Sequence, residues 1–221
     1  MNSGAGMQDL AGSGRDGHQH GLDDRGRDDR AHGRHRHKRL ATIRTSNAGE
    51  TREAGRELAR VLRPGDVVLV EGDLGAGKTT FVQGLAQGLG VIGPVTSPTF
   101  TLLRVLQCGA DGSAAPGQGA PRQAAPGQGI RSLLHADIYR LDNLQEVLEL
   151  GLPELLDDAA VAAIEWGDAA VPVLGEVAFE VRIEQDESKE AGEDDRLVII
   201  TGSERDGGCC EVPAPVSDPS A

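Results

Sequence analysis

A glycine-rich segment that ends in lysine and threonine places the strongest constraint on how this chain can fold. Residues 72–79 read Gly-Asp-Leu-Gly-Ala-Gly-Lys-Thr and match the pattern G-x-x-x-x-G-K-[ST]. The segment lies directly between the apolar run 67–71 and a stretch in which Phe81, Leu85 and Leu89 recur every four residues. A phosphate-binding loop requires this order of strand, glycine-rich turn and amphipathic helix. The sequence therefore predicts an α/β fold organised around a nucleoside triphosphate site.

The residue types in this loop suit phosphate binding. Glycines allow consecutive backbone N–H groups to turn toward a phosphate chain, and the N-terminus of the following helix adds positive potential. Lys78 is expected to reach the β- and γ-phosphates, and the Thr79 hydroxyl is expected to coordinate Mg²⁺. Lysine occurs only three times in the chain, so composition does not explain its presence at the required position. The predicted nucleotide-binding residues of the loop are Gly72, Asp73, Leu74, Gly75, Ala76, Gly77, Lys78, Thr79 and Thr80.

The sequence also indicates which nucleotide to expect. GTP-binding proteins carry an N-K-x-D segment and a D-x-x-G segment after the loop, and neither pattern follows here. GTP is therefore disfavoured, and ATP with Mg²⁺ is the expected ligand.

Strand and helix patterns alternate along the rest of the chain. Short strands are predicted at 40–44, 67–71, 99–106, 132–138, 161–165, 177–183 and 197–201. Helical spacing of apolar residues predicts helices at 50–62, after the loop as far as Gly90, and at 143–150. This alternation predicts a P-loop NTPase-like α/β sandwich with a largely parallel central sheet, to which 177–183 and 197–201 add antiparallel strands.

Composition separates this predicted domain, residues 40–202, from three segments without a core. Residues 1–39 hold five of the six histidines and few large apolar side chains, which predicts a disordered tail. Residues 109–129 contain Ala-Ala-Pro-Gly-Gln-Gly twice, which predicts a flexible insertion. Residues 203–221 are predicted to be a second disordered tail.

Charge and hydropathy exclude several functions. The net charge is −13, and residues 41–221 carry 14 basic against 29 acidic residues, so the domain should repel polyphosphate. Any role with nucleic acid is expected to be indirect. No apolar run approaches the roughly 18 residues of a membrane span, and no signal peptide is evident. Three cysteines without a disulfide or zinc spacing fit a reducing cytoplasm.

Two carboxylates are candidates for the acid that a P-loop site needs near Mg²⁺. Glu165 ends the apolar run 160–164, which would place it at the sheet edge beside the loop. Asp137 is the alternative, because a strand there would carry His135, Asp137 and Tyr139 on one face. A half-solvated strand would show the same alternation, so both candidates stay open.

Hydroxyl groups supply a candidate sensor for the γ-phosphate. Residues 96–99 read Thr-Ser-Pro-Thr after the helix that follows the loop, where a switch would contact phosphate. A hydroxyl-rich turn before a strand is equally ordinary. Trp166, the only tryptophan, is expected to pack in the core unless a site lies beside it.

Four segments taken together resemble the bacterial TsaE family, the ATPases of tRNA threonylcarbamoyladenosine biosynthesis. They are residues 72–81, 97–102, 135–141 and 164–166, which read GDLGAGKTTF, SPTFTL, HADIYRL and IEW. The resemblance covers about residues 40–202 and is far more specific than the loop alone. It implies that Trp166 lines the nucleotide side of the pocket.

The resemblance implies a role for each matching residue. Lys78 and Thr79 would bind phosphate and Mg²⁺, and Glu165 would complete the Mg²⁺ site. Thr99 resembles the family's switch, and Asp137 is a candidate for catalysis or for coupling to partners.

The resemblance also implies partners and a cellular setting. A member of this family would be a cytoplasmic ATPase that works with TsaB and TsaD, which install threonylcarbamoyl on adenosine 37 of tRNA. Its contact with tRNA would be only through that complex, in agreement with the acidic domain.

Two other functions are compatible with a P-loop. A small-molecule kinase would need an arginine-bearing lid, and the region after the loop is poor in arginine. A nucleotide-dependent switch would bind ATP without meaningful turnover. The two acids Glu165 and Asp137 favour hydrolysis over such a switch.

Overall fold

A seven-stranded sheet organises the part of the chain that the computed structural model describes, residues 37–109, 129–141, 144–156, 159–167, 171–188 and 192–203. All of these residues belong to one unit, Arg34–Ala221. The predicted tails and insertion fall mostly on residues 1–36, 110–128 and 204–221, which lie outside the described residues. The first strand begins at Lys38, slightly before the domain boundary predicted at residue 40.

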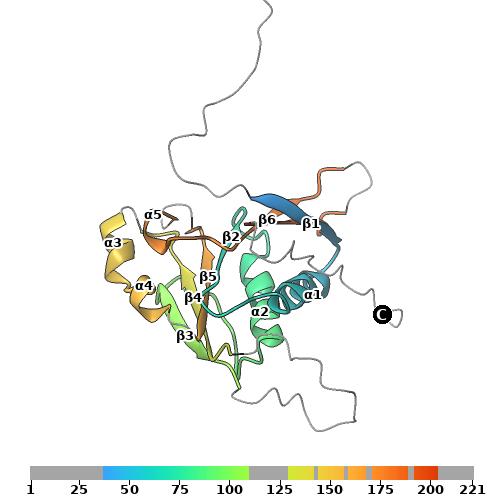
Figure 1. The fold of residues 1–221 in the computed structure, drawn as a ribbon. Helices are drawn as coiled ribbons and strands as arrows, with labels where there is room; N and C mark the ends of the chain where they lie inside the picture. Colours follow the sequence, from blue (N-terminus) through green and yellow to red (C-terminus); the bar gives the residue numbers. More distant parts are fainter. Residues whose placement is uncertain are drawn as a thin grey trace, which may run out of the picture. The chain divides into compact units, whose positions relative to one another are not determined.

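The sheet is parallel in its centre and antiparallel at both ends (Figure 1). In spatial order its strands are β1 (Lys38–Thr45), β7 (Arg196–Gly202), β6 (Phe179–Gln185), β2 (Val67–Glu71), β5 (Ala160–Glu165), β4 (Ser132–Asp137) and β3 (Leu103–Gln107). Strands β6, β2, β5 and β4 run parallel to one another. Strands β1 and β7, β6 and β7, and β3 and β4 form antiparallel pairs. The predicted fold class is confirmed.

Helices cover both faces of this sheet. They are α1 (Ala48–Ala59), α2 (Lys78–Gly88), α3 (Leu144–Glu149), α4 (Leu152–Leu155) and α5 (Val171–Leu174). Figure 1 shows α1 and α2 on one face and the three short helices on the other. Neighbouring residues of β2 enter different cores: Val68 packs in the cluster with Phe81, whereas Leu69 packs in the cluster with Leu152. The strand is therefore buried on both faces, as a central parallel strand should be.

Glycines let α1 and α2 approach each other closely. A Cβ atom at Gly84 would lie 1.8 Å from the carbonyl oxygen of Arg52, and one at Gly55 would lie 2.2 Å from that of Phe81. Only a residue without a side chain fits either position. Because α2 begins at the end of the glycine-rich loop, this packing also fixes the direction in which the loop opens.

The structure corrects one expectation about β3 and excludes one alternative for β4. The strand predicted at 99–106 begins only at Leu103. Before it, the N–H groups of Thr101 and Leu102 both donate to the carbonyl of Pro98, and Leu102 has a φ of 62°, so the chain turns instead. The half-solvated alternative for β4 is excluded, because His135 and Asp137 are 0% and 4% exposed.

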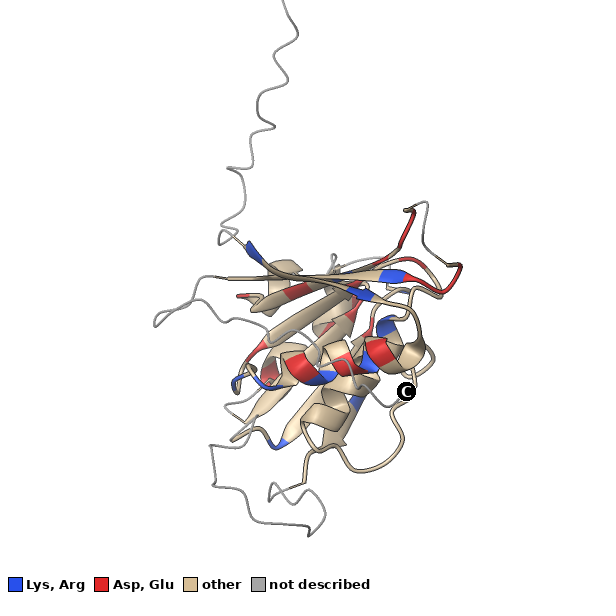
Figure 2. Ribbon diagram, turned by 90° about the vertical axis from the view of Figure 1, so that its right-hand side faces the viewer, with Lys and Arg blue, Asp and Glu red and all other residues tan. Residues whose placement is uncertain are grey.

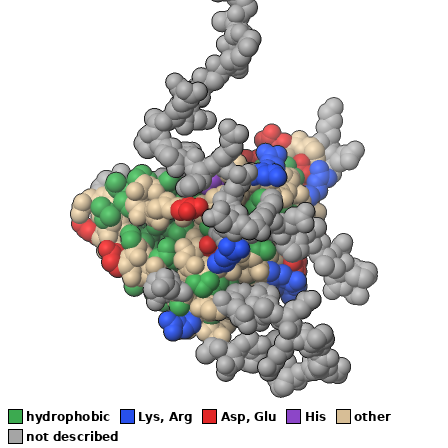
Figure 3. Space-filling view, viewed as in Figure 1, with side chains coloured by type: hydrophobic (Ala, Val, Ile, Leu, Met, Phe, Trp, Pro, Cys, Tyr) green, Lys and Arg blue, Asp and Glu red, His purple; other side chains and the backbone are tan. Residues whose placement is uncertain are grey.

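The described surface carries acidic and apolar groups in different places. Figure 2, a ribbon coloured by residue type, shows acidic residues where β6 leads toward β7. Apolar side chains remain exposed on the short helices, and Figure 3 shows them on the side where Figure 1 places α3 and α4. They include Leu144, Leu148 and Leu155, each at least 40% exposed. Within the described residues, no helix has the length and apolar character of a membrane span.

Candidate nucleotide-binding site

The glycine-rich loop connects β2 to α2 and has the backbone form that its glycines allow. Gly72, Gly75 and Gly77 have φ angles of 140°, 82° and 107°, a region that favours glycine. A Cβ atom at Gly72 would lie 2.3 Å from the carbonyl oxygen of Ile183 on β6. The loop therefore needs glycine both for its turns and for its close approach to the sheet.

Lys78 begins α2 and lies across the loop. Its Nζ donates to the carbonyl oxygens of Gly72 and Asp73, each at 2.7 Å. The same atom lies 3.9 Å from the centre of the Trp166 ring, a cation–π contact. Burial lowers the pKa of Lys78 from its usual value, and the negative charges of Glu165, Asp137 and Asp73 oppose that effect. The ammonium thus closes the loop at its base and faces the tryptophan.

Glu165 lies at the end of β5 and joins two other elements. The Thr79 hydroxyl on α2 donates to Oε1 and Oε2 of Glu165, at 2.9 and 3.1 Å. His135 Nε2 on β4 lies 2.8 Å from Oε1 of the same carboxylate. Glu165 is only 3% exposed, so these neighbours replace water around its charge. A hydroxyl and a carboxylate are in this way brought together beside the loop lysine.

Asp137 lies at the same level on the neighbouring strand and contacts a different segment. Its Cα is opposite that of Glu165 in the parallel pairing of β4 with β5. Asp137 Oδ2 accepts hydrogen bonds from the hydroxyl of Thr99 and, at 3.4 Å, from that of Ser97. Oδ1 accepts from the N–H of Tyr139 at 3.1 Å. Asp137 therefore ties the hydroxyl-rich turn to the end of β4.

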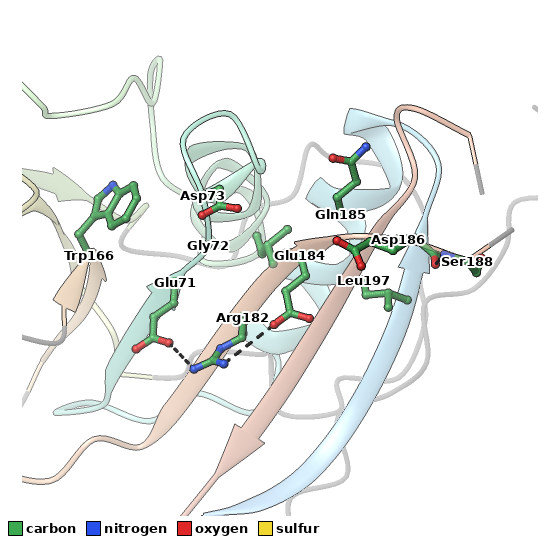
Figure 4. A pocket seen from close by; sticks show the side chains of 12 residues that line it. Glu71, Gly72, Asp73, Trp166, Arg182, Glu184, Gln185, Asp186, Ser188 and Leu197 are labelled. Atoms are coloured by element: carbon green, nitrogen blue, oxygen red, sulfur yellow. Dashed lines mark hydrogen bonds and ion pairs between the residues drawn. The ribbon is translucent and has the colours of Figure 1, made fainter. Parts of the chain in front are cut away.

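Trp166 forms one wall of an open groove of about 780 Å³ beside the loop. It has a φ of 60°, and its ring lies 4.8 Å from that of Tyr139, centre to centre. Figure 4 shows the opposite wall, which is formed by the end of β6 and the residues after it. There Arg182 pairs with Glu71 at 3.1 Å. The groove lies at the carboxyl ends of parallel strands, where α/β sheets commonly bind ligands.

Comparisons with known proteins identify the family of this chain. A family model described as "Threonylcarbamoyl adenosine biosynthesis protein TsaE" matches residues 45–193. The chain belongs to the TsaE family. The resemblance based on four segments of the sequence is confirmed.

Relatives of this TsaE-family chain match most of its described domain. The tRNA threonylcarbamoyladenosine biosynthesis protein TsaE of Streptomyces coelicolor is 41% identical over 152 residues, which cover 68% of this chain and 89% of the relative. The protein of the same name from Bacillus subtilis is 34% identical over 158 residues, covering 72% and 83%. The crystal structure of Bacillus subtilis YdiB is similar with a TM-score of 0.54 and 30% identity, and the match covers 77% of this chain and 89% of that one.

The site residues predicted from sequence come from four separate segments of this family member, and most lie together. Those with direct contacts to one another are Lys78, Thr79, Glu165 and Trp166 in one group, and Asp137 and Thr99 in a second. Leu74 differs, because it is 87% exposed at the tip of the loop. The functional roles of these residues stay predictions.

Sequence reasoning missed two parts of the site. The alternation in sequence places His135 on a polar strand face but gives no sign that it contacts Glu165 directly. The wall after β6 was missed because its residues form no motif; the parallel pairing of β6 with β2 brings them to the loop. In this wall the N–H of Ser188 donates to Oδ1 of Asp186 at 2.9 Å. Nη2 of Arg44 lies 2.7 Å from Oδ2 of the same carboxylate. Chiefly the Ser188 hydrogen bonds, with help from Arg44, lower the pKa of Asp186.

Proposed function

We propose that this chain binds ATP with Mg²⁺ at residues 72–79 and hydrolyses the ATP in support of threonylcarbamoyladenosine formation on tRNA. One observation carries the proposal: the hydroxyl of Thr79 lies 2.9 Å from the carboxylate of Glu165, which is 86 residues away in sequence. Lys78, the lysine of the loop pattern, lies next to them. Membership of the TsaE family supports the pathway.

The residues at this position suit a magnesium ion. Hydroxyl and carboxylate oxygens are ligands that Mg²⁺ prefers, and nucleotide phosphates usually supply others. Thr79 and Glu165 would hold the ion. When bound with the nucleotide, Mg²⁺ would neutralise charge that develops on the phosphoryl oxygens.

The remaining residues have distinct tasks in this proposal. Lys78 donates to phosphate oxygens, and the groove beside Trp166 takes the nucleoside. Thr99 senses the γ-phosphate through the turn that it shares with Ser97. Because Asp137 accepts the hydroxyl of Thr99, a change in this turn reaches the end of β4 directly. Asp137 therefore serves catalysis or couples the nucleotide to partners.

The partners in this proposal are TsaB and TsaD, and the complex they form with this chain works in the cytoplasm. Residues 41–221 carry 14 basic against 29 acidic side chains, which disfavours direct attraction to tRNA. Contact with tRNA then occurs through the complex. Among the described residues no arginine contacts Thr79 or Glu165, so we expect hydrolysis by this chain alone to be slow.

The test measures nucleotide affinity, phosphate release and tRNA modification with the purified chain, in the presence and absence of TsaB and TsaD. We expect phosphate release that requires Mg²⁺ and increases with the partners. The variant Glu165→Ala should lose most of this activity. Glu149→Ala, on the exposed side of α3, is the matched control and should retain it.

Other outcomes would contradict the proposal in different ways. Phosphate transfer to a small acceptor, unaffected by the partners, would indicate a kinase. Nucleotide binding without phosphate release under any condition would indicate a switch. Sustained modification of tRNA without this chain would refute the role in the pathway.

A further inference from the structure

His135 contacts the proposed magnesium ligand but has no task in the function described above. Its side chain is 0% exposed on β4, and Nε2 lies 2.8 Å from Oε1 of Glu165. His135 lies two residues before Asp137 on the same face of β4. Asp137 in turn contacts the hydroxyl-rich turn. One face of β4 therefore supplies a partner to each half of the site.

The atoms in this contact define its direction. An ionised carboxylate only accepts hydrogen bonds, so the proton of the contact belongs to Nε2 of His135. The other ring nitrogen, Nδ1, is buried and has no hydrogen-bond partner among the described residues. A proton on Nδ1 would be buried without an acceptor, which is unfavourable. The ring thus acts as a single donor aimed at Glu165.

This donor restricts the orientation of the Glu165 carboxylate. Oε1 accepts hydrogen bonds from both His135 and Thr79, whereas Oε2, among the described residues, accepts one from Thr79 alone, at 3.1 Å. Rotation of the carboxylate would break the contact with the histidine. The oxygen that remains available is therefore kept on the side of the loop.

We propose that His135 is a positioning residue, which holds the Glu165 carboxylate in the orientation that receives Mg²⁺ together with a nucleotide. This inference rests on the proposed function. Groups that hold a metal ligand in place commonly contribute about 10- to 100-fold to metal affinity. Loss of the His135 donor should therefore weaken the affinity for Mg²⁺ by a similar factor while leaving metal-free nucleotide binding intact.

Three substitutions separate the donor from the bulk of the ring. In His135→Gln the amide nitrogen occupies the position of Nε2 and can still donate to Glu165. In His135→Asn the amide reaches only as far as Nδ1, and His135→Leu keeps much of the volume without a donor. The His135→Gln variant should therefore bind Mg²⁺ about as well as the wild type, whereas His135→Asn and His135→Leu should bind it more weakly.

The experiment follows the fluorescence of Trp166, the only tryptophan, as MgCl₂ is added to the full chain with a non-hydrolysable ATP analogue. For Asn and Leu we expect the Mg²⁺ concentration at half-maximal change to rise about 10- to 100-fold. Affinity for the analogue in a chelator should stay within about threefold of wild type. Thermal unfolding of each variant reports any purely structural role separately.

The outcomes are distinguishable. A wild type that does not respond to the nucleotide refutes the proposed function itself. If the wild type responds but all variants share its Mg²⁺ midpoint, only the role of His135 is overturned. A folded Gln variant as impaired as Asn also overturns it. If Leu does not fold, the comparison of Gln with Asn decides.

Discussion

Replacing Lys78 with methionine removes the ammonium and keeps most of the side-chain stem. In the wild type Nζ donates two hydrogen bonds of 2.7 Å to the carbonyls of Gly72 and Asp73 and lies 3.9 Å from the Trp166 ring centre. The variant loses these contacts but also no longer buries a charge. Because the two effects oppose each other, we expect the free energy of unfolding at neutral pH to change by less than about 2 kcal/mol.

The effect on ATP affinity follows from the donors that remain. An ammonium has three N–H groups, and two are bonded to the loop carbonyls, which leaves one for a phosphate oxygen. A hydrogen bond with a charged group contributes about 1.5–3 kcal/mol. Since about 1.4 kcal/mol corresponds to a factor of ten, Lys78→Met should weaken ATP binding about 10- to 150-fold.

Calorimetric titration with ATP measures this change directly, and a fluorescent ATP analogue gives a second value. Trp166 fluorescence is less suitable here because the substitution alters the surroundings of the ring itself. Lys38→Met, an exposed lysine at the start of β1, is the matched control and should bind like the wild type. An affinity within about threefold of wild type in a folded Lys78→Met variant would refute the phosphate-binding assignment.

The difference in stability between the wild type and Lys78→Met should depend on pH. Burial lowers the pKa of Lys78 from 10.5, so between the folded pKa and 10.5 the unfolded state holds more protons. The free energy of unfolding contributed by Lys78 therefore rises with pH over this window. Urea denaturation at about pH 7 and about pH 10 should show the wild type gaining stability relative to Lys78→Met. An unchanged difference would contradict the burial of a charged amine.

Three further changes test other parts of the structure. Asp137→Ala removes the hydrogen-bond acceptor of Thr99. It should lower threonylcarbamoyladenosine formation by more than about tenfold and change ATP affinity by less than about threefold. Equal losses of formation and affinity would contradict a role separate from nucleotide binding. Gly84→Ala places a Cβ 1.8 Å from the Arg52 carbonyl and should cost about 1–3 kcal/mol, a fall of about 2–12 °C in Tm by circular dichroism. Replacing 110–128 with a short Gly-Ser turn should leave ATP affinity unchanged, because the flanking N–H of Cys108 already donates to the carbonyl of Arg131 at 2.8 Å. A shortened chain that does not fold would show that the fold needs this segment.

The loop and the central strands could be predicted because their signals are local. The strand at Val67–Glu71 has the predicted bounds, and the glycine-rich segment follows it directly. The prediction of a strand at 99–106 is wrong because the structure of this segment depends on a distant contact. Its threonines favour extended chain, but the hydroxyl of Thr99 is bonded to Asp137, 38 residues further on. A contact at that distance in sequence leaves no local signal.

The choice between the two acids also depended on tertiary contacts. Glu165 and Asp137 both end buried parallel strands and lie opposite each other in register, so any argument from strand position applies equally to both. What separates them is the partner that each one meets. Glu165 contacts Thr79 at the start of α2, and Asp137 contacts the turn before β3. Those partners, one on α2 and one in the turn before β3, are brought together by tertiary packing, which no strand pattern reports.

The polar face of β4 shows what alternation alone leaves open. On an outer strand, alternate polar residues usually face water, and this reading leaves His135 without a role. Here that face is buried in the core that includes α2, so a polar group on it needs a partner within the protein. His135 finds one in Glu165, and Asp137 finds one in Thr99. Two buried carboxylates, a buried histidine and two threonines are unfavourable singly, and their pairing at one sheet edge is what a site for a charged ligand requires.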